Sequence, residues 1–208
     1  MRDNFIFDSS LVLYLPLYQL DGASLMSRDA YGHLCTVTGA LWTPSGREFD
    51  GVDDYIDVAT HPILNIGTGD FSSGLWINWD IGKQGVAVDF FGGDAGNFVF
   101  HKSEVNALHL SDGTDWPEFG AKAVFGEWKQ YFAVRKEGVF YTYLDGGAIT
   151  HFSANWNINF ATNPLYIGRA HGFVRYFKGP IGEVFFYNRA LTPQEIQHNY
   201  LSTRWRYQ

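Results

Sequence analysis

One short stretch of the chain gathers the side chains that proteins use to bind sugars. Ser111-Asp112-Gly113-Thr114-Asp115-Trp116 holds two carboxylates, two hydroxyls and an indole within six residues. An exposed aromatic ring stacks on the apolar face of a pyranose, and carboxylates accept hydrogen bonds from its hydroxyls. The stretch therefore predicts ligand contacts from Asp112, Asp115 and Trp116. The alternative is that Trp116 packs over the rim of a sheet with Pro117, because large aromatic side chains usually bury most of their area.

Two further residues are candidates for ligand contact. Trp156 lies in Ala154-Asn155-Trp156-Asn157, where two amide side chains flank an indole. It has the same alternative as Trp116, which is burial against a sheet. His171 lies in Arg169-Ala170-His171-Gly172-Phe173, which follows a strand-like run and is expected to form a loop tip.

Strand-forming segments must position these loops. Aromatic and β-branched runs alternate with Gly- and Asp-containing turns along the chain, and Lys136-Glu137-Gly138 has the length and the glycine of a hairpin connection. The predicted strands cover roughly residues 11–15, 34–38, 55–58, 71–79, 86–91, 98–100, 128–135, 139–144, 148–152, 165–167 and 181–187.

One helix is predicted near the C-terminal end. The Thr192 hydroxyl can accept hydrogen bonds from free backbone N–H groups, and Pro193 suits the first helical position. Glu195 can complete a capping box with Thr192. The helix is expected over about residues 194–200, so the pattern is that of an all-β protein with a short C-terminal helix.

Composition agrees with this class and limits the partners. Of 208 residues, 46% are apolar and 18% aromatic, which suits wide sheets with a large core. No linker or repeat divides the chain, so we expect one domain over residues 1–208. A net charge of −7 lacks the basic footprint that nucleic acid requires. We also expect Cys35, the single cysteine, to be buried, and no signal peptide or membrane insertion.

Five stretches of the sequence, in a fixed order, resemble those of a known family of domains. They are Phe49-Asp50-Gly51-Val52-Asp53-Asp54-Tyr55-Ile56; residues 69–77; Gly126-Glu127-Trp128 with Tyr143-Leu144-Asp145-Gly146; Pro164-Leu165-Tyr166-Ile167-Gly168-Arg169; and residues 177–192. In order and spacing they resemble the laminin-G-like domains of the concanavalin A-like lectin/glucanase superfamily, over roughly residues 10 to 200. The resemblance implies a two-sheet antiparallel β-sandwich of the concanavalin A-like jelly-roll type.

Calcium is the cofactor that the resemblance implies, because several relatives hold Ca²⁺ in loops at the sandwich edge. Such a site needs about six to eight oxygen ligands. Asp112 with Asp115, or Asp29 with the loop near Gly32, could contribute carboxylates. Neither run has the spacing of a recognised calcium loop, so solvated loops without an ion are the alternative. Relatives often carry an acidic residue where this chain has Gly182. This difference weakens the inference of a calcium site from the relatives to this chain.

Related glucanases carry Glu-x-Asp-x-x-Glu on one strand, and Glu48, Asp50 and Asp53 approach that pattern. The last position is Asp rather than Glu, and Asp50-Gly51 is expected to form a turn that takes Asp53 off the face shared by the other two. No other motif for a metal, a nucleophile or a phosphate is present. We therefore expect no enzymatic activity.

The predicted function is a non-catalytic carbohydrate-binding or adhesive module, with a glycan or a surface protein as its partner. The fold alone does not decide this, because it hosts binders and enzymes alike. The rival is a structural or assembly protein that decorates a virion or a cell surface, as a homo-oligomer or on a larger particle. A glycoside hydrolase is the third alternative. Each of these functions implies an extracellular, cell-surface or virion-surface location.

Overall fold

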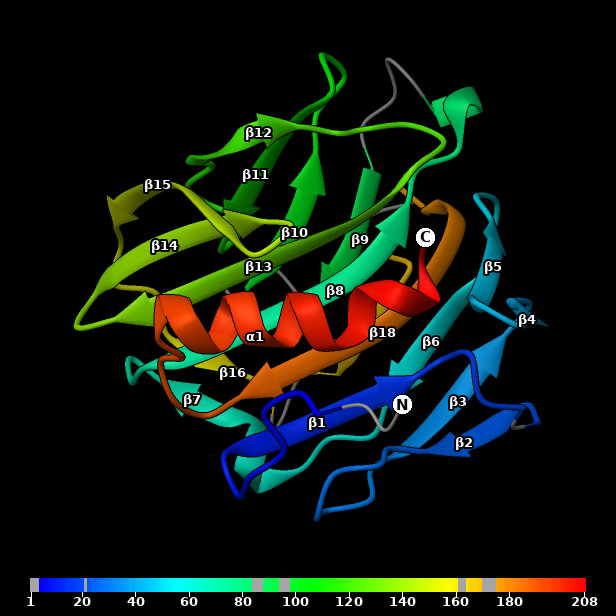
Figure 1. Cartoon of the computed structure of the whole chain (residues 1–208), viewed down its shortest axis with the longest axis horizontal. Helices are drawn as coiled ribbons and strands as arrows, with labels where there is room; N and C mark the ends of the chain where they lie inside the picture. Colours follow the sequence, from blue (N-terminus) through cyan, green and yellow to red (C-terminus); the bar gives the residue numbers. More distant parts are fainter. Residues whose placement is uncertain (1–3, 21, 84–87, 94–97, 161–163, 170–174) are drawn as a thin grey trace.

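The computed structural model describes all residues except 1–3, 21, 84–87, 94–97, 161–163 and 170–174. Its strands form two large antiparallel sheets, which stack face to face with one α-helix on the outside (Figure 1). The predicted two-sheet β-sandwich with a short C-terminal helix is confirmed. None of the helices in the described part of the chain is long and apolar enough to cross a membrane.

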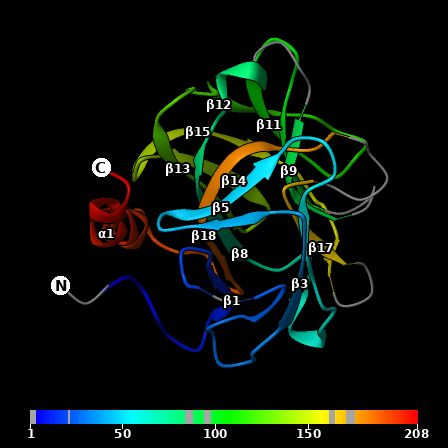
Figure 2. The same cartoon turned by 90° about the vertical axis from the view of Figure 1, so that its right-hand side faces the viewer.

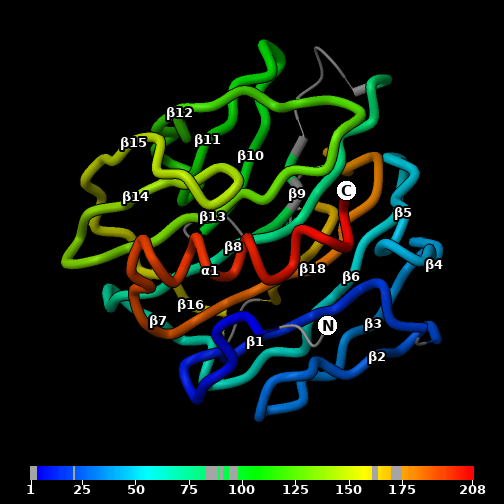
Figure 3. The backbone as a smooth tube through the Cα atoms, in the orientation of Figure 1, coloured from blue at the N-terminus to red at the C-terminus, as the bar shows by residue number. Residues whose placement is uncertain are grey.

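The first sheet, sheet A, has the strand order β15-β14-β13-β8-β18-β5-β4, and β1 also pairs with β18. The tube in Figure 3 shows β1 beside β18, although they stand near opposite ends of the sequence. The strands of sheet A are β1 (Leu11–Pro16), β4 (Leu41–Thr43), β5 (Gly46–Asp50), β8 (Phe71–Asn78), β13 (Trp128–Lys136), β14 (Val139–Leu144), β15 (Gly147–Ser153) and β18 (Lys178–Tyr187).

The second sheet, sheet B, has the order β12-β11-β10-β9-β17-β6-β3-β2. Its strands are β2 (Ser24–Met26), β3 (Leu34–Thr38), β6 (Tyr55–Val58), β9 (Val88–Gly92), β10 (Val99–Lys102), β11 (Ala107–Ser111), β12 (Glu118–Lys122) and β17 (Leu165–Ile167). A small separate sheet pairs β7 (Asn65–Gly67) with β16 (Ile158–Asn159). Short 3-10 helices cover Pro62–Leu64 (η1), Ile81–Lys83 (η2) and Arg204–Arg206 (η3).

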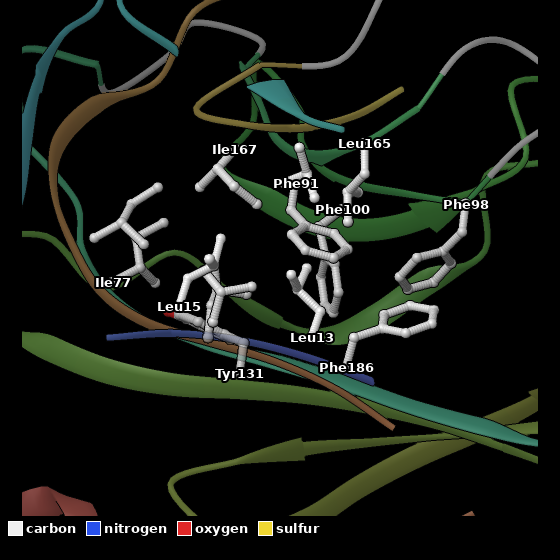
Figure 4. Close-up of a cluster of buried hydrophobic side chains, with 14 of the residues drawn as sticks. Leu13, Leu15, Ile77, Phe91, Phe98, Phe100, Tyr131, Leu165, Ile167 and Phe186 are labelled. Atoms are coloured by element: carbon white, nitrogen blue, oxygen red, sulfur yellow. The ribbon is translucent and has the colours of Figure 1, made fainter. Parts of the chain in front are cut away.

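Aromatic and aliphatic side chains from the two sheets fill the layer between them. Leu13 and Phe186 of sheet A face Phe91 and Phe100 of sheet B in this layer (Figure 4). Cys35 is also completely buried here, as expected. Burial of these large side chains is the main contribution to the stability of the sandwich, because apolar area removed from water stabilises in proportion to its size.

The helix α1 (Pro193–Thr203) covers the outer face of sheet A (Figure 2). Both hydrogen bonds of the predicted capping box between Thr192 and Glu195 are present. Ile196 packs into a second hydrophobic cluster, on the outer face of sheet A, and the indole N–H of Trp76 donates to the Thr203 hydroxyl at 2.8 Å. The helix thereby protects the apolar outer face of this sheet from water.

A buried arginine ties one end of the sandwich together. The Arg135 guanidinium lies over the rings of Phe71 and Phe140, and the side chain is almost fully buried. It donates hydrogen bonds to three backbone carbonyls, at residues 67, 69 and 156. Burial lowers the pKa of Arg135 to about 10, although the negative charge of Asp70 opposes the shift. Because it joins three separate segments, Arg135 fixes the loops at this end.

Candidate functional site

The loop of residues 112–117 joins β11 to the edge strand β12 of sheet B. Oδ1 of Asp112 holds the loop in a tight turn, because it accepts hydrogen bonds from the N–H groups of Thr114 at 2.9 Å and Asp115 at 3.0 Å, and from the Thr114 hydroxyl at 2.7 Å. Burial raises the pKa of Asp112, but these hydrogen bonds outweigh it and lower the pKa below its ordinary value. Asp112 is therefore ionised at neutral pH.

Trp116 lies on the surface at the end of this loop and is 36% exposed. Its ring forms a T-shaped contact with the His101 ring, with a centroid distance of 4.8 Å and an interplanar angle of 72°. Its backbone carbonyl lies 3.0 Å from Nδ1 of His109. Since a carbonyl only accepts, this nitrogen carries the proton. His101 and His109 are direct cross-strand neighbours in the β10–β11 pair, so the sheet itself positions the indole.

A buried carboxylate supports this arrangement from below. Oδ1 of Asp89 lies 2.6 Å from Nδ1 of His101, and the Asp89 side chain is fully buried while His101 is almost so. This short contact orients the His101 ring, against which Trp116 rests. A ring held in this way loses little conformational entropy when a ligand stacks on it.

The two loop carboxylates keep hydrogen-bonding capacity for a ligand. Oδ1 of Asp115 accepts the N–H of Trp116 at 3.0 Å, as Oδ1 of Asp112 accepts those within the turn. Within the described part of the chain, Oδ2 of either residue accepts no hydrogen bond. The loop therefore presents an indole face, two carboxylate oxygens and the Thr114 hydroxyl together. Of the predicted set, Asp112, Asp115 and Trp116 are brought into one place.

Asp89, His101 and His109 were not predicted as residues of the site. The alternation Leu108-His109-Leu110 was the available signal, because the two leucines are buried and the histidine between them points to the other face. The pairing of His101 with Asp89 requires the register of β9 against β10, which shifts between Phe100 and His101. Alternation within one strand does not predict such a shift.

Trp156 and His171 are the other two predicted ligand contacts. Trp156 is 6% exposed and packs against the rings of Phe140 at 4.8 Å and Phe152 at 5.9 Å. The prediction that Trp156 offers a face to a sugar is wrong, because the core already covers its ring. His171 lies outside the described residues.

Asp29 is an anchor within the fold rather than a calcium ligand. Its side chain is fully buried. Oδ2 accepts the N–H of Tyr14 at 3.0 Å, and Oδ1 accepts those of Tyr31 at 2.8 Å and Gly32 at 3.3 Å. The loop that holds Asp29 joins β2, the edge strand of sheet B opposite to β12. The prediction of Asp29 as a metal ligand is therefore wrong, and it cannot share a site with Asp112 and Asp115.

Another group of carboxylates stands after β5. Asp50, Asp53 and Asp54 bring one oxygen each within 4.8 Å of one another. Asp50 accepts the N–H groups of Val52 and Asp53, and Asp54 accepts the N–H of Asp50. These bonds build the turn that was predicted at Asp50-Gly51, where Gly51 has a φ of 79°. Acidic groups at a surface turn commonly stand together without an ion, and calcium stays a prediction for this chain.

Glu48 precedes this turn on β5 and lines a hollow of about 340 Å³ together with Asn78 and Asp80. Burial raises the pKa of Glu48 and the charge of Asp80 raises it further, while Lys178 lowers it. Lys178 lies 3.3 Å from a carboxylate oxygen of Asp80. Asp53 stands beyond the end of β5 and does not line this hollow, so the three acidic residues compared with the glucanase pattern do not form one set.

Solved structures of other proteins share this architecture. Trypanosoma rangeli sialidase superposes with a TM-score of 0.72 at 18% identity, over 94% of this chain and 33% of that chain. The binding domain of botulinum neurotoxin serotype D gives 0.74 at 10% identity, over 94% and 52%. The binding domain of botulinum neurotoxin DC in complex with SialylT gives 0.71 at 14% identity, over 93% and 51%. At these identities the likeness shows a shared fold.

This chain spans about a third of the sialidase and about half of the toxin binding domains. A search of curated proteins finds no match. A family model described as the concanavalin A-like lectin/glucanases superfamily matches residues 50–197, which is more than half of the chain. The two stacked antiparallel sheets agree with that match, and the chain belongs to the concanavalin A-like lectin/glucanase superfamily.

Proposed function

We propose that this protein is a non-catalytic carbohydrate-binding module and that the loop of Asp112, Asp115 and Trp116 contacts the glycan. The observation that carries the proposal is the exposed indole of Trp116, held against the His101–Asp89 pair beside two carboxylate oxygens that accept no hydrogen bond from a described residue. The indole would stack on the apolar face of a sugar ring, and Asp112 and Asp115 would accept its hydroxyls.

Two features favour binding over structure as the role of this loop. A Trp that served only the core would be more deeply covered, as Trp156 is. The ring of Trp116 is also held by its T-shaped contact with His101 while part of it stays exposed, which favours a preformed platform. The neurotoxin binding domain that shares this fold was solved in complex with SialylT. That ligand belongs to the toxin, but it is consistent with a glycan ligand for this chain.

A second candidate function, assembly through protein contacts, is favoured by one observation. The edge strand β4 of sheet A carries Leu41, which is 70% exposed, and Trp42, which is 38% exposed. Exposed edge strands with apolar side chains are surfaces on which proteins pair. The experiment below separates this candidate from carbohydrate binding.

The test is a glycan-array screen of three proteins, with and without calcium: the wild type, Trp116→Ala and Trp205→Ala. Trp205 is 52% exposed on η3, outside the loop, and is a matched control for loss of a surface indole. We expect glycan binding by the wild type and the control, and a loss of about tenfold in affinity for Trp116→Ala, since a stacked aromatic contact contributes about 0.5–1.5 kcal/mol beyond area burial.

An array on which the wild type binds no glycan contradicts the proposal. So does full binding by Trp116→Ala. If the wild type binds no glycan but forms oligomers that Leu41→Glu dissociates, the assembly function is supported instead. Loss of binding when calcium is withdrawn would support the predicted metal at Asp112 and Asp115.

A further inference from the structure

A second concave surface lies at the other side of the molecule, where η1, β7, the β13–β14 hairpin and the start of α1 meet (left in Figure 1). It consists of two hollows of about 530 and 250 Å³, which share Lys136 and Ala190. We call it the Lys136 groove. Small-molecule sites typically measure about 300–1,000 Å³, so the groove has the size of a ligand site.

The smaller hollow provides an aromatic surface. Tyr141 lies on the outer face of β14 and is 37% exposed. The His151 ring of the neighbouring strand β15 stacks against it, with a centroid distance of 5.8 Å and an interplanar angle of 29°. Tyr143 continues the same face and is buried beneath the groove. A flat ring supported in this way can receive the apolar face of a sugar.

The larger hollow is polar. Asn65 and Asn188 line it, and both are exposed. Their amides can donate and accept hydrogen bonds from hydroxyl groups. Gly69 forms part of the wall, and its carbonyl is held in place by the Arg135 guanidinium. The polar wall is therefore built on a rigid end of the sandwich.

Arg189, which lines the larger hollow, has its charge already matched. Its guanidinium donates to Asp8 at 2.9 Å and to Glu195 at 2.7 Å, and a second nitrogen donates to Glu195 at 2.9 Å. These hydrogen bonds raise the pKa of Arg189. With two carboxylates on one guanidinium, this group carries a net negative charge, so Arg189 offers no free positive charge to a ligand.

Asp70 is the acidic residue that lines the groove, and it interacts with other groups of the fold. Its Oδ1 accepts the N–H of Glu137 at 2.8 Å, and its charge acts on the buried cation of Arg135. Lys136 is different. It is exposed, it lies between the two hollows, and it forms no ion pair or hydrogen bond with any described residue. Lys136 is therefore the lining cation whose charge no described residue pairs.

We propose that the Lys136 groove is a second binding site, for a saccharide that bears a carboxylate, with the sugar ring on Tyr141, the carboxylate at Nζ of Lys136 and the hydroxyls at Asn65 and Asn188. The proposal rests on the proposed carbohydrate-binding function for its class of ligand, but it is independent of Trp116. A cation beside an aromatic plate selects an acidic sugar over a neutral one, because the neutral sugar leaves the ammonium without a partner.

The test uses a matched pair of probes, 3′-sialyllactose and lactose, which differ by one carboxylate-bearing sugar. Affinities are measured by calorimetric titration for the wild type, Lys136→Gln, Tyr141→Ala and Trp116→Ala. We expect the wild type to bind sialyllactose about tenfold more tightly than lactose, since a charge-assisted hydrogen bond is worth about that factor. Raising the salt concentration should reduce this preference.

Lys136→Gln should abolish the preference for sialyllactose, and because the side chain is exposed its replacement is compatible with the fold. Tyr141→Ala should weaken the binding of sialyllactose, and Trp116→Ala should leave the preference intact. An unchanged preference in Lys136→Gln overturns the groove proposal, and so does its loss in Trp116→Ala. If the wild type prefers neither probe but binds neutral glycans through Trp116, the groove proposal fails while the proposed function stands. If it binds no glycan at all, both fail.

Discussion

Replacing Trp156 by alanine should destabilise the fold strongly, and the same change at Trp116 should not. Trp156 is 6% exposed and lies between Phe140 and Phe152, whereas Trp116 is 36% exposed on a loop. The two indoles occur in similar local sequences with polar neighbours. The comparison therefore tests whether the structure has separated a core side chain from a binding side chain.

The expected cost follows from the buried area. A tryptophan buries about 150–250 Å², and at about 25 cal/mol per Å² this corresponds to about 4–6 kcal/mol of transfer free energy. The alanine that remains keeps part of this, and a cavity left beside Phe140 adds to the loss. We expect the free energy of unfolding to fall by about 3–5 kcal/mol for Trp156→Ala. For Trp116→Ala we expect about 1 kcal/mol or less, the cost of losing its edge contact with His101.

The assay is guanidinium denaturation followed by circular dichroism, with equal m-values required for comparison of the two variants. The reasoning is refuted if Trp156→Ala costs less than about 1 kcal/mol, or if both variants cost the same. If the Trp156→Ala protein has normal stability but no longer binds glycan, Trp156 is a ligand contact after all.

Three further predictions concern the buried arginine, the helix cap and the acidic residues of β5. Arg135→Met should lower the free energy of unfolding by about 2–5 kcal/mol in denaturant titrations, because three buried carbonyls lose their donor and only the burial cost of the cation is relieved. For Glu195, hydrogen bonds from Arg189 outweigh the effect of burial and lower the pKa, with a further hydrogen bond from Thr192. Its stabilising contribution is therefore present above the ordinary carboxyl pKa and lost as pH falls through the lowered one. The destabilisation by Glu195→Gln, about 1 kcal/mol at pH 7, should diminish in thermal melts as the pH falls below the ordinary range of a carboxyl pKa. Neither the wild type nor Glu48→Gln should release reducing sugar from β-glucans, and cleavage by the wild type that Glu48→Gln abolishes would support the hydrolase alternative.

Local signals in the sequence were sufficient for much of the fold. The capping box at Thr192 and Glu195 depends on residues three apart, and the helix begins at Pro193 as that motif requires. The hairpin at Lys136-Glu137-Gly138 is also local, since Glu137 and Gly138 take positive φ values of 51° and 77°. Short strands such as β11 and β12 were not predicted, because their pairing with neighbours rather than their own composition makes them strands.

The candidate site could be predicted only in part. The carboxylates and the indole of residues 112–116 are close in sequence, so their proximity followed directly. Whether an indole is exposed depends on partners elsewhere in the chain, as Trp156 shows against Phe140. Asp29 presents the same problem, because the N–H of Tyr14 that it accepts comes from another strand. The Lys136 groove likewise combines three separate stretches of the chain, residues 62–70, 134–143 and 188–193, which only the folded chain brings together.

The central claim, that Trp116 contacts a glycan, is tested most directly by the indole N–H resonances of the protein. The chain has seven tryptophans, and Trp116→Phe and Trp156→Phe variants assign the two resonances of interest in a ¹⁵N-labelled sample. On titration with a glycan selected from the array, the account predicts that the Trp116 resonance shifts with saturation while the Trp156 resonance stays in place. A glycan that binds while the Trp116 resonance does not move would contradict it.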